Sequence, residues 1–258
     1  MKRIYTLIAG GVLAGAALTS CDSVSEPDRI VPAEIIPQRA LLIEEFTGQR
    51  CTNCPDGHAV IKDMLVSLGD SVVPVSIHPT SIYAEPSIMG LKTATGEEYY
   101  KAAGSPALPT AVINKQTNPL QVQEWGSAVN HLILDSTPFT VKAENTLSAD
   151  GDKMNIKVAY SSGEDFTGKL QVWVLENHVI GMQIDHGTRI DAYDHMHVFR
   201  QAVNGTWGED VTLKAHEAQN AEYTVDINPF WTPENVYVVA FLYDNGGVRQ
   251  VTSTATGH

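Results

Sequence analysis

The sequence predicts a two-domain protein, with an α/β domain over residues 38–136 and an antiparallel β-sandwich of immunoglobulin-like type over residues 137–258. Three observations support this fold class. Apolar strands alternate with amphipathic helices up to about residue 135, which is typical of a layered α/β unit with parallel strand pairing. After Pro138 the apolar residues recur with a period of two, as in half-buried antiparallel strands. About seven short strands separated by turn signals then favour a sandwich.

The first domain is expected to alternate three strands with three helices. The strands are residues 40–46, 72–77 and 110–113, and the helices are residues 58–68, 94–103 and 122–134. The β-branched run Val72–Ile77, bounded by Pro79, is typical of a strand buried on both faces. In the first helix the apolar residues recur at helical spacing, at Ile61, Met64, Leu65 and Leu68. Gly104 and Pro106 end the second helix.

The second domain is expected to consist of short strands joined by turns. Alternating residues from Phe139 lead to an Asp150-Gly151 turn, and Asn245-Gly246-Gly247 predicts a hairpin near the end of the chain. The expected strands are residues 139–143, 154–160, 169–175, 195–202, 223–227, 236–243 and 249–254.

Residues 1–20 have the pattern of a lipoprotein signal peptide. Lys2 and Arg3 precede an apolar, Gly- and Ala-rich stretch over residues 4–18, which is too short for a convincing transmembrane helix. The segment Leu18-Thr19-Ser20-Cys21 resembles the lipobox of bacterial lipoproteins, which implies cleavage before Cys21 and acylation of its thiol. Ordinary cleavage that leaves Cys21 as a free thiol is the alternative. We therefore expect an outer membrane protein attached by lipid alone, on the periplasmic side or at the cell surface.

Residues 21–37 are expected to form a lipid-anchored linker, because Pro27, Pro32 and Pro37 lie among polar and acidic residues. The acidic residues after Cys21 fit either a surface-export signal or a solvated linker. The whole chain carries a formal net charge of -13, which repels nucleic acid and anionic headgroups. Neither nucleic acid nor an organic cofactor is expected as a partner.

The motif Cys51-Thr52-Asn53-Cys54 lies where a predicted strand gives way to a predicted helix. An exported chain meets oxidising conditions, so the pair can form a disulfide. A helix N-terminus also stabilises a thiolate and lowers the pKa of the outer cysteine. Cys51 would then be an exposed nucleophile and Cys54 the resolving thiol. Arg50 adds positive charge beside Cys51 and would favour its thiolate.

The segment from Glu44 to Cys54 resembles the strand and active-site segment of thioredoxin-fold proteins. That resemblance implies that Glu45, six residues before Cys51, is a buried carboxylate that accepts a proton from Cys54. It also implies that Leu108-Pro109 is a cis-proline loop, which binds an extended substrate opposite the cysteines. The sequence departs from thioredoxin itself in the Thr-Asn dipeptide between the cysteines and in the flanking residues Thr47 and Arg50, so the direction of electron transfer is left open.

Two longer segments resemble the outer membrane protein 28 family of Bacteroides-type lipoproteins. They are residues 43–58, and Val198-Phe199-Arg200 leading to Asn204-Gly205-Thr206-Trp207-Gly208. The resemblance implies a thioredoxin-like unit joined to a β-rich C-terminal domain.

The cysteine pair has three interpretations: active redox chemistry, an inert structural disulfide, or half of a metal site completed by His58. A second question concerns His195 and His197, which would project from one face of a strand. With a carboxylate nearby they could bind zinc, although histidines on such strands often hydrogen-bond to backbone.

The favoured function is thiol–disulfide exchange on exported proteins or peptides, with Cys51, Cys54 and Glu45 as catalytic residues and an external redox partner. Leu108, Pro109 and Arg50 would contact the substrate. The alternative is a non-catalytic surface module, of binding or adhesin type, in which Cys51–Cys54 is a static clamp.

Overall fold

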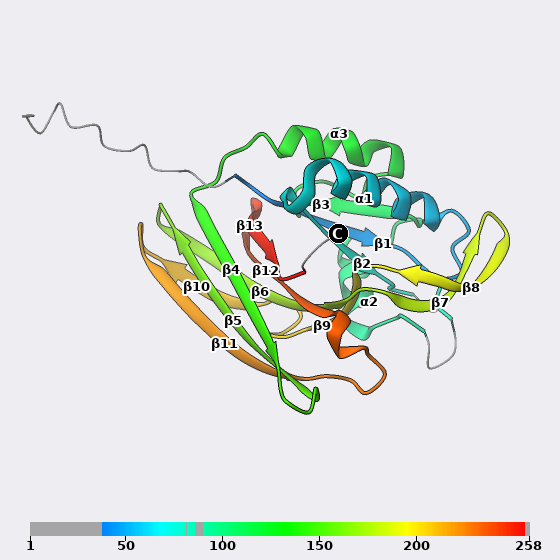
Figure 1. Cartoon of the computed structure of the whole chain (residues 1–258). Helices are drawn as coiled ribbons and strands as arrows, with labels where there is room; N and C mark the ends of the chain where they lie inside the picture. The colour runs from blue at the N-terminus through cyan, green and yellow to red at the C-terminus, as the bar shows by residue number, and fades with distance from the viewer. Residues whose placement is uncertain (1–37, 81, 86–89, 256–258) are drawn as a thin grey trace, which may run out of the picture. The chain divides into compact units, whose positions relative to one another are not determined.

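An eight-stranded sheet forms the centre of the folded chain (Figure 1). The computed structural model describes residues 38–80, 82–85 and 90–255, which belong to one compact unit. The predicted signal peptide, the linker and the lipidation site at Cys21 lie outside the described residues. Among those residues, no helix is long and apolar enough to span a membrane.

The central sheet has the strand order β13-β12-β6-β9-β2-β1-β3, and β10 pairs with β6 outside this path. Two smaller sheets have the orders β11-β5-β4 and β7-β8. The strands are β1 (Leu41–Phe46), β2 (Val72–Ile77), β3 (Thr110–Ile113), β4 (Phe139–Leu147), β5 (Lys153–Ser162), β6 (Phe166–Glu176), β7 (Val179–Asp185), β8 (Thr188–His195), β9 (Val198–Ala202), β10 (Glu209–Leu213), β11 (Ala218–Asp226), β12 (Val236–Asp244) and β13 (Gly247–Ser253). The helices are α1 (Cys54–Leu68), α2 (Ala94–Ala102) and α3 (Val122–Leu132), with short 3-10 turns η2 (Gly69–Ser71) and η3 (Pro233–Asn235).

The first half has the expected alternation of strands and helices. β1 pairs in parallel with β2 and antiparallel with β3. α1 and α3 cover one face of these strands, where Ile61 and Trp125 pack against Leu41 and Ile43 (Figure 1). α1 begins at Cys54, four residues before the predicted start. Pro55 suits this first turn because an N–H there has no partner within the helix.

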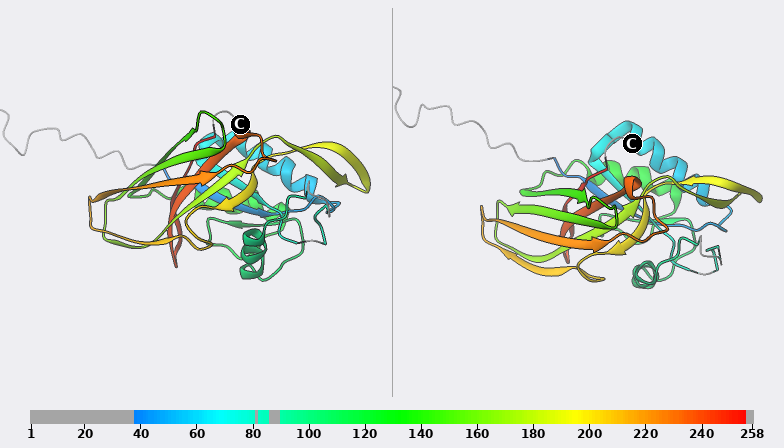
Figure 2. Two further views of the ribbon diagram at one scale, coloured as in Figure 1. Left: turned by 90° about the horizontal axis from the view of Figure 1, so that it is seen from below. Right: turned by 60° about the horizontal axis from the view of Figure 1, so that its bottom comes forward.

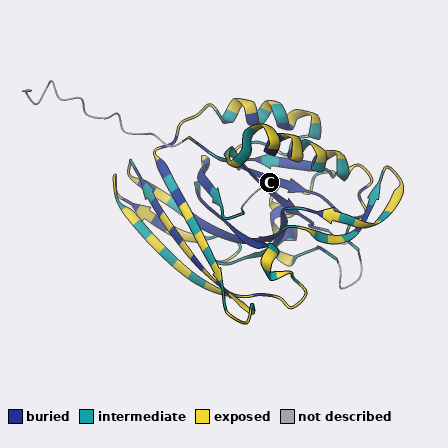
Figure 3. Cartoon of the chain, in the orientation of Figure 1, coloured by how far each residue is buried: buried dark blue, intermediate teal, exposed yellow. Residues whose placement is uncertain are grey.

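The second half buries its core between two sheets. The β11-β5-β4 sheet packs against β6, β10 and β12 through one apolar cluster. Along β5 buried and exposed residues alternate, as predicted from the period of two, and Figure 3 shows the same alternation as stripes. The chain is therefore mostly β, built from several sheets.

The central sheet joins the two predicted domains. β9 lies between β2 and β6, so the sheet continues across the predicted boundary between residues 136 and 137. β6 is buried on both faces: Val172 and Val174 face the sandwich core, whereas Trp173 and Leu175 pack with residues of β1, β2 and α2. The two halves thus share a hydrophobic cluster.

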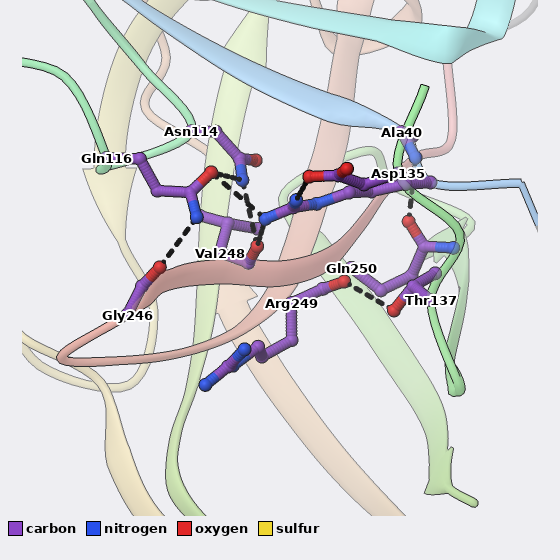
Figure 4. A network of polar contacts seen from close by, with 10 residues as sticks. Ala40, Asn114, Gln116, Asp135, Thr137, Gly246, Val248, Arg249 and Gln250 are labelled. Atoms are coloured by element: carbon purple, nitrogen blue, oxygen red, sulfur yellow. Dashed lines mark hydrogen bonds and ion pairs between the residues drawn. The ribbon is translucent and has the colours of Figure 1, made fainter. Parts of the chain in front are cut away.

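A polar network also fastens the start of the first half to the end of the chain (Figure 4). The guanidinium of Arg39 donates to the Val248 carbonyl at 2.7 Å and to Asp135 at 3.1 Å. The Asn114 amide donates to the same carbonyl at 2.9 Å, and the Gln250 side chain accepts from the Ala40 N–H at 2.9 Å. These bonds fix β1 against β13.

The sequence analysis missed β7, β8 and β10, and the strand predicted over residues 195–202 is confirmed only from Val198 onward. β8 ends at His195 and β9 begins at Val198. His197, between them, has a left-handed φ of 57°, which breaks the extended conformation. The interruption separates the β7–β8 hairpin from the central sheet.

Candidate functional site

The cysteine pair forms a disulfide, as the sequence predicted was possible, between the end of β1 and the start of α1. The Cα atoms of Cys51 and Cys54 are 5.4 Å apart. Cys54 is fully buried and Cys51 is only 4% exposed. The expectation of an exposed Cys51 is therefore wrong in this structure.

The β7–β8 hairpin covers the disulfide loop. The N–H groups of Ile184 and His186 donate to the carbonyls of Gln49 and Thr52 at 2.8 and 2.9 Å. The buried Gln183 amide donates to the carbonyls of Gly48 and Cys51 at 3.2 and 3.0 Å. The Gly187 N–H donates to the Thr52 hydroxyl at 2.8 Å. Five hydrogen bonds thus hold the hairpin over residues 48–52.

Glu45 lies at the buried end of the site. Its Oε2 accepts a hydrogen bond from the Ser76 hydroxyl at 2.9 Å, while Oε1 has no hydrogen-bond partner among the described residues. Burial raises the pKa of Glu45 to about 8, and the Ser76 bond opposes the shift. Gly57 makes room for the carboxyl, because a Cβ there would lie 2.8 Å from Oε1. The predicted buried carboxylate is thus present, and it is protonated at neutral pH.

Three histidines gather between Glu45 and the hairpin: His78 and His195 are buried, and the side chain of His58 is 18% exposed. The ring of His195, on β8, lies 5.7 Å from that of His78 and 6.4 Å from that of His58. Nε2 of His58 lies 2.9 Å from the Thr47 hydroxyl, and Nδ1 lies 2.7 Å from the hydroxyl of Tyr193. The three histidines come from distant parts of the sequence, so local patterns gave no signal for this cluster.

Burial lowers the pKa of all three histidines, to about 3 for His58, to about 4 for His195, and well below the ordinary value for His78. Their mutual proximity adds to the lowering for His58 and His78. Neither ring nitrogen of His78 has a hydrogen-bond partner in the described part of the chain, and the same holds for Nδ1 of His195. All three rings are therefore neutral at pH 7.

The predicted substrate-binding residues Pro109 and Arg50 have different neighbours in the structure. The Leu108–Pro109 peptide bond is cis, as the resemblance implied. Thr110 pairs with Phe46 in the sheet, so Pro109 lies at the end of β1 from which the disulfide loop leaves. Arg50 points elsewhere: its guanidinium lies 3.6 Å from the carboxylate of Glu85.

The predicted pair His195 and His197 does not act as one unit. Nε2 of His195 lies 3.2 Å from the Met182 carbonyl, whereas Nδ1 of His197 lies 3.1 Å from the Tyr237 hydroxyl. Within residues 38–80, 82–85 and 90–255, no group of three or more His, Cys, Asp or Glu residues is arranged to hold a metal ion.

A cavity of about 650 Å³ lies between α1 and the hairpin and is open to solvent at the exposed Val66. α1 contributes an apolar wall from Ile61, Leu65 and Val66, while Glu45 and Tyr193 line the polar part. This volume falls in the range of small-molecule sites.

Comparison with known proteins places the chain in a family. The sequence profile described as outer membrane protein Omp28 matches residues 96–258, more than half of the chain. This chain belongs to the Omp28 family. Membership confirms the resemblance predicted from the sequence and the predicted outer membrane localisation. The match begins after the cysteine motif, so it says nothing about Cys51 and Cys54.

Two solved structures have a similar fold over most of this chain. HBP35 of Porphyromonas gingivalis matches with a TM-score of 0.67 and 16% identity, over 86% of this chain and 79% of that one. A protein from Agrobacterium tumefaciens matches with a TM-score of 0.52 and 14% identity, over 86% of this chain and all of that one. A domain of the outer membrane lipoprotein Omp28 from Porphyromonas gingivalis is 25% identical over 45% of this chain and 86% of its own, with a TM-score of 0.33. No curated protein sequence matches the chain.

Proposed function

We propose that this Omp28-family chain is a non-catalytic binding module of the outer membrane, in which Cys51–Cys54 is a structural clamp. The observation that supports the proposal is the low solvent exposure of the disulfide. Cys51 is 4% exposed, and five hydrogen bonds fasten the loop around it to the β7–β8 hairpin. A disulfide that exchanges with protein substrates needs an accessible sulfur.

The clamp has a structural task. It closes a four-residue ring at the start of α1 and fixes the carbonyls that accept the hairpin's hydrogen bonds. The chain-entropy relation gives about 2 kcal/mol of stabilisation for so short a ring. The hairpin in turn forms one wall of the 650 Å³ cavity. We propose that the disulfide serves binding by holding this wall in place.

Thiol–disulfide exchange by a thioredoxin-like unit is the second candidate, and Glu45 favours it. A carboxyl with a pKa near 8 is mostly protonated at pH 7, and the minor deprotonated form can accept a proton and return it. In the reductive direction the Cys51 thiolate would attack a substrate disulfide, and a mixed disulfide would form as one substrate thiolate leaves. Cys54 would pass its proton to Glu45 and displace the second substrate thiolate. An external dithiol would then restore the pair.

Mixed-disulfide trapping separates the two candidates. In the Cys54→Ser variant the clamp account predicts no protein bound to Cys51 on non-reducing gels of the cell envelope. It also predicts that the Cys51 thiol reacts with iodoacetamide more slowly than free cysteine at pH 7. The Cys51→Ser variant is the matched control. Partners that are trapped on Cys51 and absent in that control would establish exchange and contradict the clamp.

A further inference from the structure

The β7–β8 hairpin is set apart from the central sheet. It forms a two-stranded sheet of its own, outside the hydrogen-bonded order of the central sheet. Two residues with left-handed backbone flank it, His178 with φ 56° and His197 with φ 57°. Such positions at both ends of an element are suited to act as hinges.

One face of the hairpin packs against histidine rings, which can take up protons. His195 and Tyr193 project from β8 onto His58 of α1, and His195 also meets His78, which follows β2. Each of these contacts is a ring pair with centroids between 4.9 and 6.4 Å apart. His78 and His195 are 3% and 2% exposed. The interface therefore has room for uncharged imidazoles and little water to solvate imidazolium.

We propose that the β7–β8 hairpin is an acid-sensitive cover, which opens when His58, His78 and His195 become protonated and so exposes the disulfide. Three imidazolium ions within one cluster would repel one another, and burial would deprive each of solvation. Opening the hairpin relieves both costs, because the rings then reach water. The response to pH is independent of whether the disulfide exchanges.

The groups around the cluster give little compensation for these charges. Glu45 faces His58 at 3.6 Å, but it gains its own proton before the histidines do and is neutral in acid. Arg200, from β9, lowers the pKa of His78 and His195. Asp194 raises the pKa of His195, yet its carboxylate lies 2.9 Å from His178 at the surface. Tyr193, whose pKa is raised to about 12, stays neutral.

The sign of the effect follows from these pKa values. In the closed state burial holds the pKa of all three rings below the ordinary value, at about 3 for His58 and about 4 for His195, whereas in the open state the rings titrate near 6.5. Between these limits the open state binds more protons, so acid favours opening. The opening equilibrium should rise about tenfold per pH unit for each histidine, or about a thousandfold per unit for three.

Hydrogen–deuterium exchange of the full chain at pH 7 and pH 5 tests the cover, after correction for intrinsic exchange rates. Amides of residues 179–195 and 48–52 should lose at least about tenfold more protection in acid than amides of β6 and β12. Equal protection at both pH values would overturn the proposal. A matching loss in β6 and β12 would also overturn it, because that pattern indicates global unfolding.

Variants of the histidines test whether their protonation causes the opening in acid. His78→Phe removes one proton from the cluster and should reduce the pH dependence of opening from about three protons to two. His58→Asn, at the more accessible edge of the cluster, should do the same and covers the case in which the His78 variant fails to fold. The exposed His216 is the matched control, and His216→Asn should keep the full acid response. An unchanged slope in a folded His78 or His58 variant would refute the assignment.

Discussion

The burial of Glu45 determines its protonation state in this site. The carboxyl is fully buried with a single hydrogen bond, from Ser76, and the nearest ring, His58, is neutral. A carboxylate in such a place is costly, so the group keeps its proton up to a pKa of about 8. Its position in the sequence, six residues before Cys51, was enough to predict its burial by resemblance. The histidine partners were not predictable, because the contacts join β1, α1, β2 and β8.

Replacement of Glu45 by Gln should change how stability depends on pH. Glu45 has a folded pKa of about 8 and an unfolded pKa near 4.5, so the unfolded state loses its proton first as the pH rises. Wild-type stability therefore falls between about pH 4.5 and 8, by up to about 1.4 kcal/mol per pH unit from this group. The free energy of unfolding is measured in urea at pH 5 and pH 8. The value for Glu45→Gln, relative to that of the wild type, should be higher at pH 8 than at pH 5. If the free energies of unfolding of the two proteins changed in parallel with pH, that result would contradict a buried, protonated carboxyl.

Gly57 and Gly126 form a matched pair of helical glycines. A Cβ at Gly57 would lie 2.8 Å from both Glu45 Oε1 and the ring of Trp125, whereas a Cβ at Gly126 meets open space. Overpacking costs about 1–3 kcal/mol, and the gain in helix propensity returns about 1 kcal/mol. Gly57→Ala should lower the free energy of unfolding by up to about 2 kcal/mol, and Gly126→Ala should raise it by up to about 1 kcal/mol. Denaturant titrations that show equal effects at the two positions would refute this packing.

At the scale of elements, most strands and all three helices were predictable from periodicity, and the β7–β8 hairpin was not. Its loop consists of His186 and Gly187, both with positive φ, closed by the Asp185–Thr188 pair. A two-residue turn with positive φ at both positions is usually signalled by Asn-Gly or Asp-Gly. Because histidine occupies the first position of this turn, the sequence lacks that signal. The hairpin is bonded to the loop around Cys51, and the expectation of an exposed sulfur did not include this element.

Gln183 should control access to the disulfide through the hairpin. Gln183→Leu leaves the buried carbonyls of Gly48 and Cys51 without their side-chain donor, at a cost of about 1–3 kcal/mol. Local opening should become about 5- to 150-fold more frequent, and reduction by a phosphine should accelerate by a similar factor. Ile180→Ala, at a half-exposed position on the same strand, is the control and should leave the rate unchanged. Equal rates in the two variants would show that the hairpin does not protect the disulfide.

At the scale of the whole molecule, the two halves are bound together by a shared sheet and a shared core. Local sequence patterns predicted an α/β segment and a β-rich segment, but strand order depends on contacts between distant residues. β9 joins β2 to β6, and residues of both halves fill one hydrophobic cluster. Figure 2 shows the strands of both halves from two further sides. The immunoglobulin-like type of the sandwich and the boundary near residue 137 stay predictions.

Separation of the halves should therefore prevent folding of the first. A fragment of residues 38–136 would expose Leu42, Phe46 and Val75, which in the whole chain pack against Trp173, Leu175 and related residues. We expect this fragment to lack a cooperative thermal transition and dispersed amide signals in NMR spectra. The chain over residues 38–258 is the control and should show both. A fragment 38–136 with a cooperative transition would support two independent domains.

The reduction potential of Cys51–Cys54 tests the structural-clamp account most directly. It is measured by equilibrating the full chain with defined dithiol–disulfide buffers and quantifying the free thiols after an acid quench. The buried, hydrogen-bonded disulfide predicts a potential below about -300 mV, as for structural disulfides of exported proteins. A potential between about -120 and -270 mV, the range of thioredoxin-fold oxidoreductases, would contradict the clamp and favour exchange.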